Sequence, residues 1–360
     1  MTGETEKKSK KLNKKALIVT VICIVLSFPL VIHPIATVVI YESIFGMRYE
    51  PLSWMEYDVS DYDGLICERS DFQNNDGVTL AGYKYSRDIE NAKGLVIISH
   101  GLGGGGQNAY IPFIDFFTQN SYLVFTYDAT GNGESGGRDV KGLPQGVSDL
   151  DCAIRYAKSL DVYKDLPIFL VGHSWGTYAV GCNLALHPDV AGSVMFSGFN
   201  KSKEMLLCHS KNYVGPLAHV LLPSVSLYEK IKFGKTADMS VLDGIRSTDA
   251  DVLIVHGGND ATVPRECGYD IYYEEFSDQD NIEFIMYGQR GHDYIFNSDA
   301  SKDCRDSLNA AYTAYVEERG EKYSAEIKEE FMEANLDKKL CFELDAELCA
   351  RILKIFETNE

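Results

Sequence analysis

A serine between two glycines is the first group in this sequence whose setting suggests chemistry. Gly172-His173-Ser174-Trp175-Gly176 follows a short apolar run at 167–171 and precedes a helical pattern. A bare G-x-S-x-G motif arises easily by chance, so its position between a strand and a helix carries the argument. That position predicts a tight turn holding Ser174 Oγ at a helix N-terminus, where it can act as a nucleophile in acyl transfer. A purely structural turn serine is the alternative.

A serine hydroxyl needs a base to take its proton, and the base needs a carboxylate to orient it. Asp260 follows an apolar run at 251–257, and His292 follows another at 282–288. Because both residues come after strands, we expect them at the sheet edge where Ser174 emerges. We therefore predict that Ser174 attacks, His292 carries the proton and Asp260 orients the imidazole.

The other histidines and two neighbouring aspartates suit these roles less well. Asp251 lies at the wrong end of its strand, and Asp293 directly follows His292, where it is badly placed to orient that ring. The remaining histidines lie at strand ends beside glycines, in helices or the insertion, or in the apolar N-terminal run: His100, His173, His256, His187, His209, His219 and His33.

Acyl transfer also requires N–H donors for the oxyanion that forms on the substrate carbonyl. Trp175 directly follows the nucleophile and supplies the first expected donor. The loop His100-Gly101-Leu102-Gly103-Gly104-Gly105-Gly106 follows an earlier strand and supplies the second, the N–H of Leu102. Its glycines allow a substrate to approach the backbone closely.

Short apolar runs bounded by turn residues alternate with helical stretches through most of the chain. Such runs are typical of strands buried on both faces, so the alternation predicts an α/β fold, a mostly parallel sheet with helices on both faces. An earlier pair of strands, 65–73 and 78–86, flanks a turn and predicts an antiparallel hairpin. The expected buried strands are 94–100, 122–128, 167–173, 192–198, 251–257 and 282–288, with helices near 107–119, 145–160, 175–187 and 264–276.

The main domain is expected at 64–300, with a helical lid inserted at 199–248. We expect this insertion to form an apolar acyl pocket through Leu217, Val220, Leu221 and Leu222. After His292 the chain becomes charged and helical, which predicts a packed C-terminal appendage at 301–360.

The N-terminus predicts a membrane anchor. Residues 1–15 hold six lysines against two glutamates, and residues 16–41 carry no formal charge over a length that can span a bilayer. The positive-inside rule then places 1–15 in the cytoplasm and the catalytic domain outside, after a linker at 42–63. The alternatives are a cleaved signal peptide and a buried core helix. With an anchor, deleting residues 1–45 is expected to leave an active domain.

Composition limits the partners. The 360-residue chain carries a net charge of −19, which becomes −23 without the +4 of residues 1–15. A field of this sign repels phosphate, so we do not expect the main domain to bind nucleic acid. Eight of the nine cysteines lie beyond residue 41 without metal-ligand spacing. No metal or cofactor is expected, disulfides remain open, and Cys152 and Cys182 are expected as buried thiols in core helices.

Residues 78–298 resemble an α/β-hydrolase of the monoacylglycerol-lipase-like and serine-aminopeptidase-like group. The resemblance rests on HGLG (100–103), YDATGNGESGG (127–137), GHSWG (172–176), HGGND (256–260) and GH (291–292). It implies a serine hydrolase acting on a small or lipid ester without a cofactor, and a buttressing role for the stretch from Asp128 to Ser135. Thr177 stands where glycine is frequent, and the insertion carries no family signature, which leaves the acyl and alcohol groups open.

Three other interpretations compete. The glycines at 101, 103 and 106 fit a dinucleotide-binding fingerprint, but this interpretation leaves Ser174, Asp260 and His292 without a role. A serine peptidase or aminopeptidase of the same fold is the nearest alternative to an esterase. A surface binding module without activity is the third, although such a module would normally show a broken triad. The oligomeric state is open.

Overall fold

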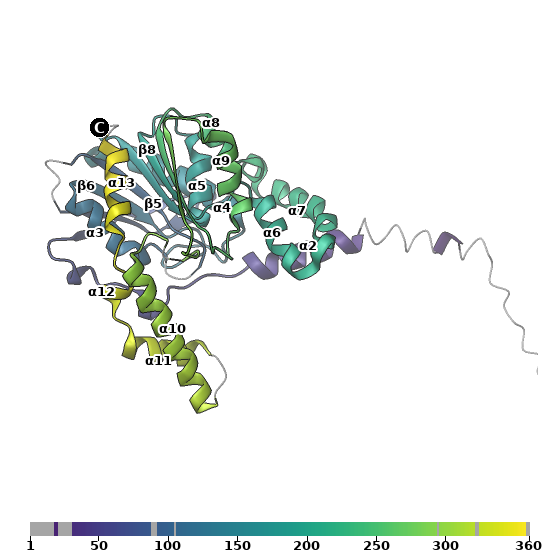
Figure 1. The fold of residues 1–360 in the computed structure, drawn as a ribbon. Helices are drawn as coiled ribbons and strands as arrows, with labels where there is room; N and C mark the ends of the chain where they lie inside the picture. The colour runs from purple at the N-terminus through teal and green to yellow at the C-terminus, as the bar shows by residue number, and fades with distance from the viewer. Residues whose placement is uncertain are drawn as a thin grey trace, which may run out of the picture.

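One eight-stranded sheet lies at the centre of the molecule (Figure 1). The computed structural model describes residues 18–20, 31–87, 92–103, 106–293, 295–320 and 324–357. In spatial order the strands are β1 (Ile66–Arg69), β4 (Gly82–Ser86), β6 (Tyr122–Tyr127), β5 (Gly94–Ser99), β7 (Ile168–His173), β8 (Gly192–Phe196), β9 (Asp251–Gly257) and β10 (Ile282–Tyr287).

The six strands from β5 to β10 pair in parallel, and β4 pairs antiparallel with both of its neighbours. The predicted mostly parallel sheet is confirmed. The predicted hairpin is divided, because β2 (Phe72–Gln73) and β3 (Thr79–Leu80) form a small sheet of their own while β1 and β4 join the main one.

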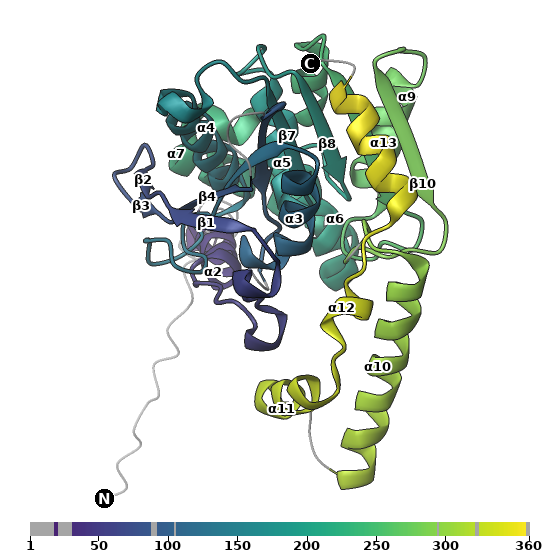
Figure 2. The same ribbon diagram turned by 90° about the vertical axis from the view of Figure 1, so that its left-hand side faces the viewer.

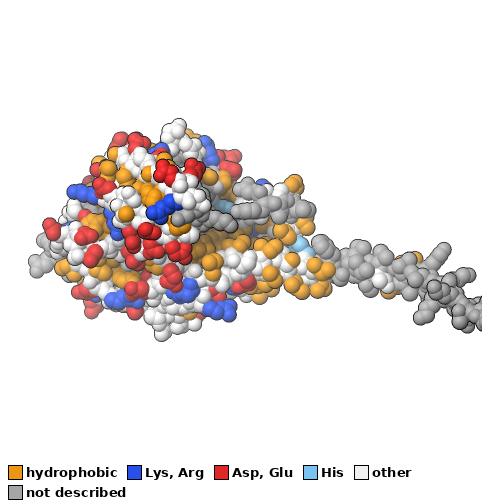
Figure 3. Space-filling model, turned by 90° about the horizontal axis from the view of Figure 1, so that it is seen from below, with side chains coloured by type: hydrophobic (Ala, Val, Ile, Leu, Met, Phe, Trp, Pro, Cys, Tyr) orange, Lys and Arg blue, Asp and Glu red, His pale blue; other side chains and the backbone are white. Residues whose placement is uncertain are grey.

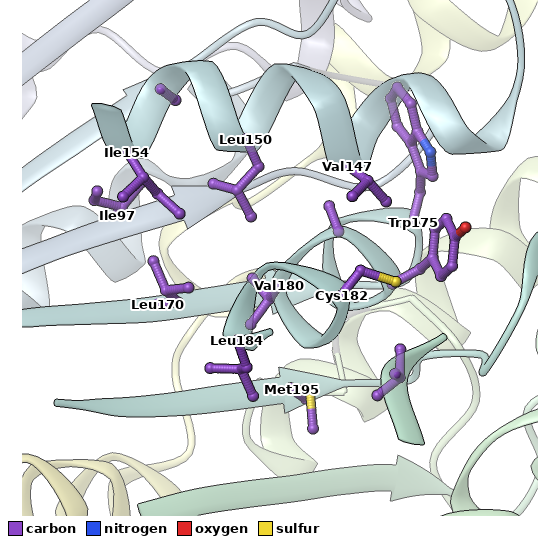
Figure 4. Packing of buried hydrophobic residues seen from close by; sticks show 14 of the residues in the cluster. Ile97, Val147, Leu150, Ile154, Leu170, Trp175, Val180, Cys182, Leu184 and Met195 are labelled. Carbon is purple, nitrogen blue, oxygen red and sulfur yellow. The ribbon is translucent and has the colours of Figure 1, made fainter. Parts of the chain in front are cut away.

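Helices cover both faces of the sheet, because successive strand side chains point to opposite sides. Leu95 and Ile97 face one hydrophobic cluster, and Val96 and Ile98 face the other. The first face is covered by α4 (Leu143–Ser159), α5 (Trp175–Leu184), α8 (Val241–Arg246) and α9 (Tyr269–Phe276), and the second by α3 (Ile111–Gln119) and α13 (Ala346–Glu357). Figure 4 shows α4 directing Val147, Leu150 and Ile154 toward the sheet and α5.

The insertion after β8 is helical and contains no strand among the residues that the structure describes there. Its main helices are α6 (Ser202–Val214) and α7 (Ala218–Phe233), followed by α8. Against α7 lies α2 (His33–Phe45), a segment nearly two hundred residues earlier in the chain (Figure 1). Tyr41 and Phe45 of α2 are 3% exposed and belong to the core cluster.

The predicted transmembrane segment lies largely outside the described residues, which omit 1–17 and 21–30. Within the described part of the chain, no helix combines the length and hydrophobicity needed to cross a bilayer. The structure also places ordered helix across the predicted boundary between anchor and linker, since α2 continues to Phe45. Residues 33–45 therefore pack as part of the folded domain.

The predicted C-terminal appendage divides into two parts. The first is α10 (Asp299–Arg319), α11 (Ala325–Asn335) and α12 (Lys338–Cys341), which extend away from the sheet (Figure 2). The second is α13, whose Phe356 ring stacks on that of Phe169 in β7 with 4.2 Å between centroids. The last helix is thus part of the main core.

Two disulfides answer the question that the sequence left open. Cys208–Cys267 ties α6 to the segment after β9, and Cys304–Cys341 ties α10 to α12. Cys152 and Cys182 are buried free thiols in α4 and α5, as expected.

Candidate active site

Ser174 occupies the turn between β7 and α5. Its backbone has φ 56° and ψ −116°, a conformation that a non-glycine residue adopts only where the surroundings enforce it. Glycine is required on both sides of this turn because a larger side chain would clash with the neighbouring backbone. A Cβ on Gly176 would lie 1.9 Å from the Ser99 carbonyl oxygen, and one on Gly172 would lie 2.5 Å from that of Gly176. The motif therefore encodes a turn that leaves the serine hydroxyl exposed to the cavity.

The structure brings together the three residues that the sequence singled out. Ser174 Oγ lies 2.8 Å from His292 Nε2, and His292 Nδ1 lies 2.8 Å from Asp260 Oδ2. The segments carrying Asp260 and His292 follow β9 and β10, which are neighbours in the sheet. In this geometry Nδ1–H donates to the carboxylate, which leaves Nε2 free to accept the serine proton.

Asp260 is held as a carboxylate by its surroundings. Burial raises its pKa, but the hydrogen bond and positive charge of His292 and the N–H of Val263 outweigh burial and leave the pKa below its usual value. Its second oxygen accepts hydrogen bonds from the N–H groups of Thr262 (3.0 Å) and Val263 (2.7 Å). The carboxylate is therefore fixed in orientation as well as charge.

His256 also approaches Asp260, at 3.5 Å, but its Nε2 lies 2.9 Å from the Val263 carbonyl oxygen and donates to it. Burial lowers the pKa of His256, so this ring is neutral and supports the loop after β9.

A second hydrogen-bonded chain, which no sequence pattern indicated, lies behind these three residues. The N–H of Gly101 donates to the Tyr110 hydroxyl (3.1 Å), which donates to His173 Nδ1 (3.0 Å). His173 Nε2 in turn donates to the His292 carbonyl oxygen (3.2 Å). Burial, with the charge of His292, lowers the pKa of His173 to about 3, so the ring stays neutral and can donate and accept at once. The chain joins the glycine loop, the serine turn and the His292 loop.

A cavity of about 460 Å³ lies in front of Ser174 and His292. Leu102 and Trp175, the two predicted N–H donors, both line it. Trp175 is the first residue of α5, where the backbone N–H has no partner within the helix. Most of the wall is apolar and comes from α2, α6 and the loops, including Ile44, Phe45, Met205 and Leu206.

Three of the residues predicted for an acyl pocket do not line this cavity, and the side chain of the fourth, Leu217, lies outside the described residues. Val220 is 57% exposed, and Leu221 and Leu222 line an adjoining cavity of about 80 Å³ that shares Ile44, Phe45 and Leu206 with the first. The insertion therefore contributes apolar side chains as predicted, but the wall next to Ser174 comes from another of its helices. Helix α6 borders the candidate active site, whereas α7 packs against α2. No local sequence pattern predicts this contact between distant segments.

Residues 90–247 match the family described as serine aminopeptidase, S33. The quorum-quenching protein AidA of Acinetobacter baumannii is 32% identical over 44% of this chain and 51% of its own. Rat monoglyceride lipase is 26% identical over 49% of this chain and 57% of its own. The chain thus spans about half the length of these curated relatives.

A solved esterase of Pyrococcus furiosus matches 76% of this chain and 98% of its own, with a TM-score of 0.54 and 17% identity. The chain has the α/β-hydrolase fold. At this identity the esterase structure establishes the fold alone. The sequence matches connect this α/β-hydrolase to the monoglyceride-lipase-like and serine-aminopeptidase-like group, as the motifs indicated.

The stretch after β6 buttresses the site of this α/β-hydrolase, as the resemblance implied. Asp128 accepts hydrogen bonds from the N–H of Gln107 (2.9 Å) and from that of Glu134 (3.0 Å). A Cβ on Gly106 would lie 2.4 Å from the same carboxylate. The Asp128 side chain thus occupies the space against Gly106 and ties the glycine loop to the Asp128–Ser135 stretch. This close packing explains why residue 106 is a glycine, without a bound dinucleotide.

Proposed function

We propose that this protein is a serine hydrolase that cleaves carboxylic esters through an acyl-enzyme. The observation that carries the proposal is the continuous contact from Ser174 through His292 to Asp260, at the wall of an apolar cavity. Ser174 Oγ attacks the ester carbonyl while His292 Nε2 takes its proton and Asp260 stabilises the imidazolium. The N–H groups of Leu102 and Trp175 hold the oxyanion.

Collapse of the tetrahedral intermediate breaks the ester C–O bond, and His292 returns the proton to the leaving alcohol. Water then repeats the sequence on the acyl-enzyme and releases the acid. An apolar wall suits the acyl part of a lipid or small hydrophobic ester, and the similarity to monoglyceride lipase supports the same class. The insertion helix α6 acts as the lid of this pocket in our proposal.

We also propose that the protein is membrane-bound with its catalytic domain outside the cytoplasm. Support comes from the uncharged run at 16–41 behind the lysine-rich arm, and from exposed apolar side chains on the outer faces of α2 and α7. Ile35 and Val39 are 58% and 61% exposed, and Leu227 and Ile231 are 61% and 75% exposed. Apolar side chains gather at this end of the molecule (Figure 3). Recovery of the full chain in the soluble fraction after cell lysis would contradict the proposal.

A fluorophosphonate probe tests the proposed nucleophile. The unaltered protein should be labelled covalently, and Ser174→Ala should abolish labelling, because Ser174 carries the only hydroxyl that hydrogen-bonds His292 Nε2 among the residues that the structure describes. Ser210→Ala is a matched control on α6 and should retain labelling. Labelling that persists in Ser174→Ala would place the nucleophile elsewhere.

A p-nitrophenyl ester series from acetate to palmitate then measures acyl preference. Faster cleavage of a peptidyl amide than of every ester would favour a peptidase.

A further inference from the structure

Helices α2 and α7 expose apolar side chains that their packing against each other leaves uncovered. Ile35 and Val39 are four residues apart on α2, so they lie on one face of that helix. On α7 the exposed apolar residues are seven and four positions apart and also follow one face: Val220, Leu227 and Ile231. More than half of the surface of each of these five residues is exposed. We call this surface the α2–α7 face, and its size and position mark it as an interaction surface.

The α2–α7 face is joined to the cavities inside the domain by two further side chains of α2. Ile44 lines both the cavity at Ser174 and the adjoining cavity of about 80 Å³, yet 46% of its surface is exposed. Ile40 lines the adjoining cavity and is 50% exposed. The exposed surface of α2 and the walls of both cavities therefore share side chains, and these side chains are apolar.

The insertion that carries α7 is basic, whereas the chain as a whole is acidic. Residues 201–235 hold six lysines against Glu204 and Glu229, a net charge of +4 in a chain of net charge −19. Lys211 of α6 and Lys235, directly after α7, are exposed, and neither forms an ion pair with a residue that the structure describes. An anionic lipid surface offers hydrocarbon to the apolar side chains and negative charge to the lysines. A second copy docked symmetrically would instead bring like charges together.

We infer that the α2–α7 face docks on an anionic lipid bilayer, and that the ester enters the active site from that bilayer rather than from water. This inference rests on the proposed function. It goes beyond attachment by the N-terminal run, because it assigns a surface of the folded domain and the route of the substrate. The apolar side chains of the face enter the acyl region of the bilayer, and the lysines lie at the lipid phosphates. The acyl chain of the ester then passes Ile40 and Ile44 to reach Ser174.

The test compares a bilayer-resident ester with a water-soluble one. The full-length protein is reconstituted in vesicles of phosphatidylcholine and phosphatidylglycerol that contain 1-oleoylglycerol, and p-nitrophenyl butyrate is assayed with the same vesicles. The double variant Leu227→Asp/Ile231→Asp should cleave 1-oleoylglycerol roughly tenfold or more slowly, because charged side chains resist entry into hydrocarbon. Its rate on p-nitrophenyl butyrate should stay nearly unchanged, since neither residue lines the cavity at Ser174.

The matched control makes the same change of charge at two exposed apolar residues on the opposite side of the domain. Val162 and Leu186 are 39% and 48% exposed and precede β7 and β8, so they lie near the sheet edge opposite Ser174. Val162→Asp/Leu186→Asp should keep both rates.

A second variant tests the charge. Lys211→Glu/Lys235→Glu should cleave 1-oleoylglycerol roughly tenfold more slowly in the anionic vesicles, and should match the unaltered protein in vesicles of phosphatidylcholine alone. An equal loss in both kinds of vesicle would overturn the role of the anionic lipid.

Equal rates on 1-oleoylglycerol for Leu227→Asp/Ile231→Asp and its control overturn the docking, while hydrolysis of p-nitrophenyl butyrate upholds the esterase. An equal loss on both esters, together with a change from dimer to monomer, would assign the face to a second copy and also overturn the docking. Failure to cleave either ester, with no fluorophosphonate labelling of the unaltered protein, overturns the proposed function and the docking with it.

Discussion

At the residue scale, the three proposed catalytic side chains are positioned by groups that take no part in the reaction. Asp260 is oriented by two backbone N–H groups, and the backbone of His292 is held by the neutral ring of His173. A base held from both sides loses little conformational freedom when the substrate binds, which favours catalysis.

Asp260→Asn should lower kcat for p-nitrophenyl butyrate by roughly 10³- to 10⁴-fold, because an amide neither carries the charge that stabilises the imidazolium nor selects the productive tautomer. Steady-state kinetics measure this loss, and circular dichroism checks that the fold persists. Asp278→Asn, a change to an exposed carboxylate before β10, serves as the control. A loss of less than tenfold in Asp260→Asn would remove this residue from the triad.

His173 predicts a pH dependence of stability. Its pKa is about 3 in the folded protein, mainly because of burial and then the charge of His292, against about 6.5 when unfolded. Between these values the unfolded chain binds the extra proton, so the free energy of unfolding falls as pH drops below about 6.5. At pH 5 this single group costs about 2 kcal/mol.

Urea unfolding at pH 7.5 and pH 5.0 measures this effect. His173→Gln should lose less stability between the two pH values than the unaltered protein, whereas the exposed-residue control His219→Gln should match it. The same loss in all three proteins would show that His173 ionises freely in the fold.

At the scale of elements, α2 is a wall of the active-site cavity as well as a continuation of the N-terminal segment. The Tyr41 hydroxyl donates to Glu229 of α7 (3.0 Å), and Glu229 is 1% exposed. Glu42 accepts hydrogen bonds from Tyr228 (2.6 Å) and Lys232 (2.5 Å) of the same helix. These contacts couple α2 to the insertion and hold Ile44 and Phe45 at the cavity.

Two truncations separate the parts of the N-terminus. Removal of residues 1–31 should retain esterase activity, because the whole of α2 remains. Removal of residues 1–45 should abolish activity on long-chain esters and lower the melting temperature, since the core loses the buried Tyr41 and Phe45 side chains and the cavity loses one side. The sequence alone predicted the opposite for 1–45. Full activity and unchanged melting in that truncation would mean that α2 is dispensable.

At the scale of the whole molecule, the chain closes its core with its last helix. Leu348, Ile352 and Phe356 of α13 are fully buried on the sheet face opposite α5, and Phe356 contacts strand β7, which leads to Ser174. The proposed catalytic turn therefore depends on packing contributed by the end of the chain.

Phe356→Ala should lower the free energy of unfolding by about 3–5 kcal/mol, the usual cost of removing a buried phenylalanine. Urea denaturation measures the difference. Glu357→Ala, which removes only an exposed 3.5 Å ion pair with Lys93, should cost less than about 1 kcal/mol. Comparable costs for the two variants would show that α13 is loosely attached.

The sequence by itself determined the local features of this protein, those that depend only on residues close together in the chain. The buried strands, the serine turn and the loops bearing Asp260 and His292 follow from apolar runs, glycines and chain order, because each is encoded within a few consecutive residues. Parallel strands then place those loops at one edge, so the set Ser174, Asp260 and His292 could be predicted without coordinates.

Only the tertiary structure decided which distant segments surround that set. The packing of residues 33–45 on α7, the choice of α6 over α7 as the cavity wall, the chain from Tyr110 through His173 and the exposed α2–α7 face all join residues far apart in sequence. An apolar face specifies that it must be covered and leaves open which other face covers it, because hydrophobic burial has no direction. The covering partner is selected by the shape of the whole molecule.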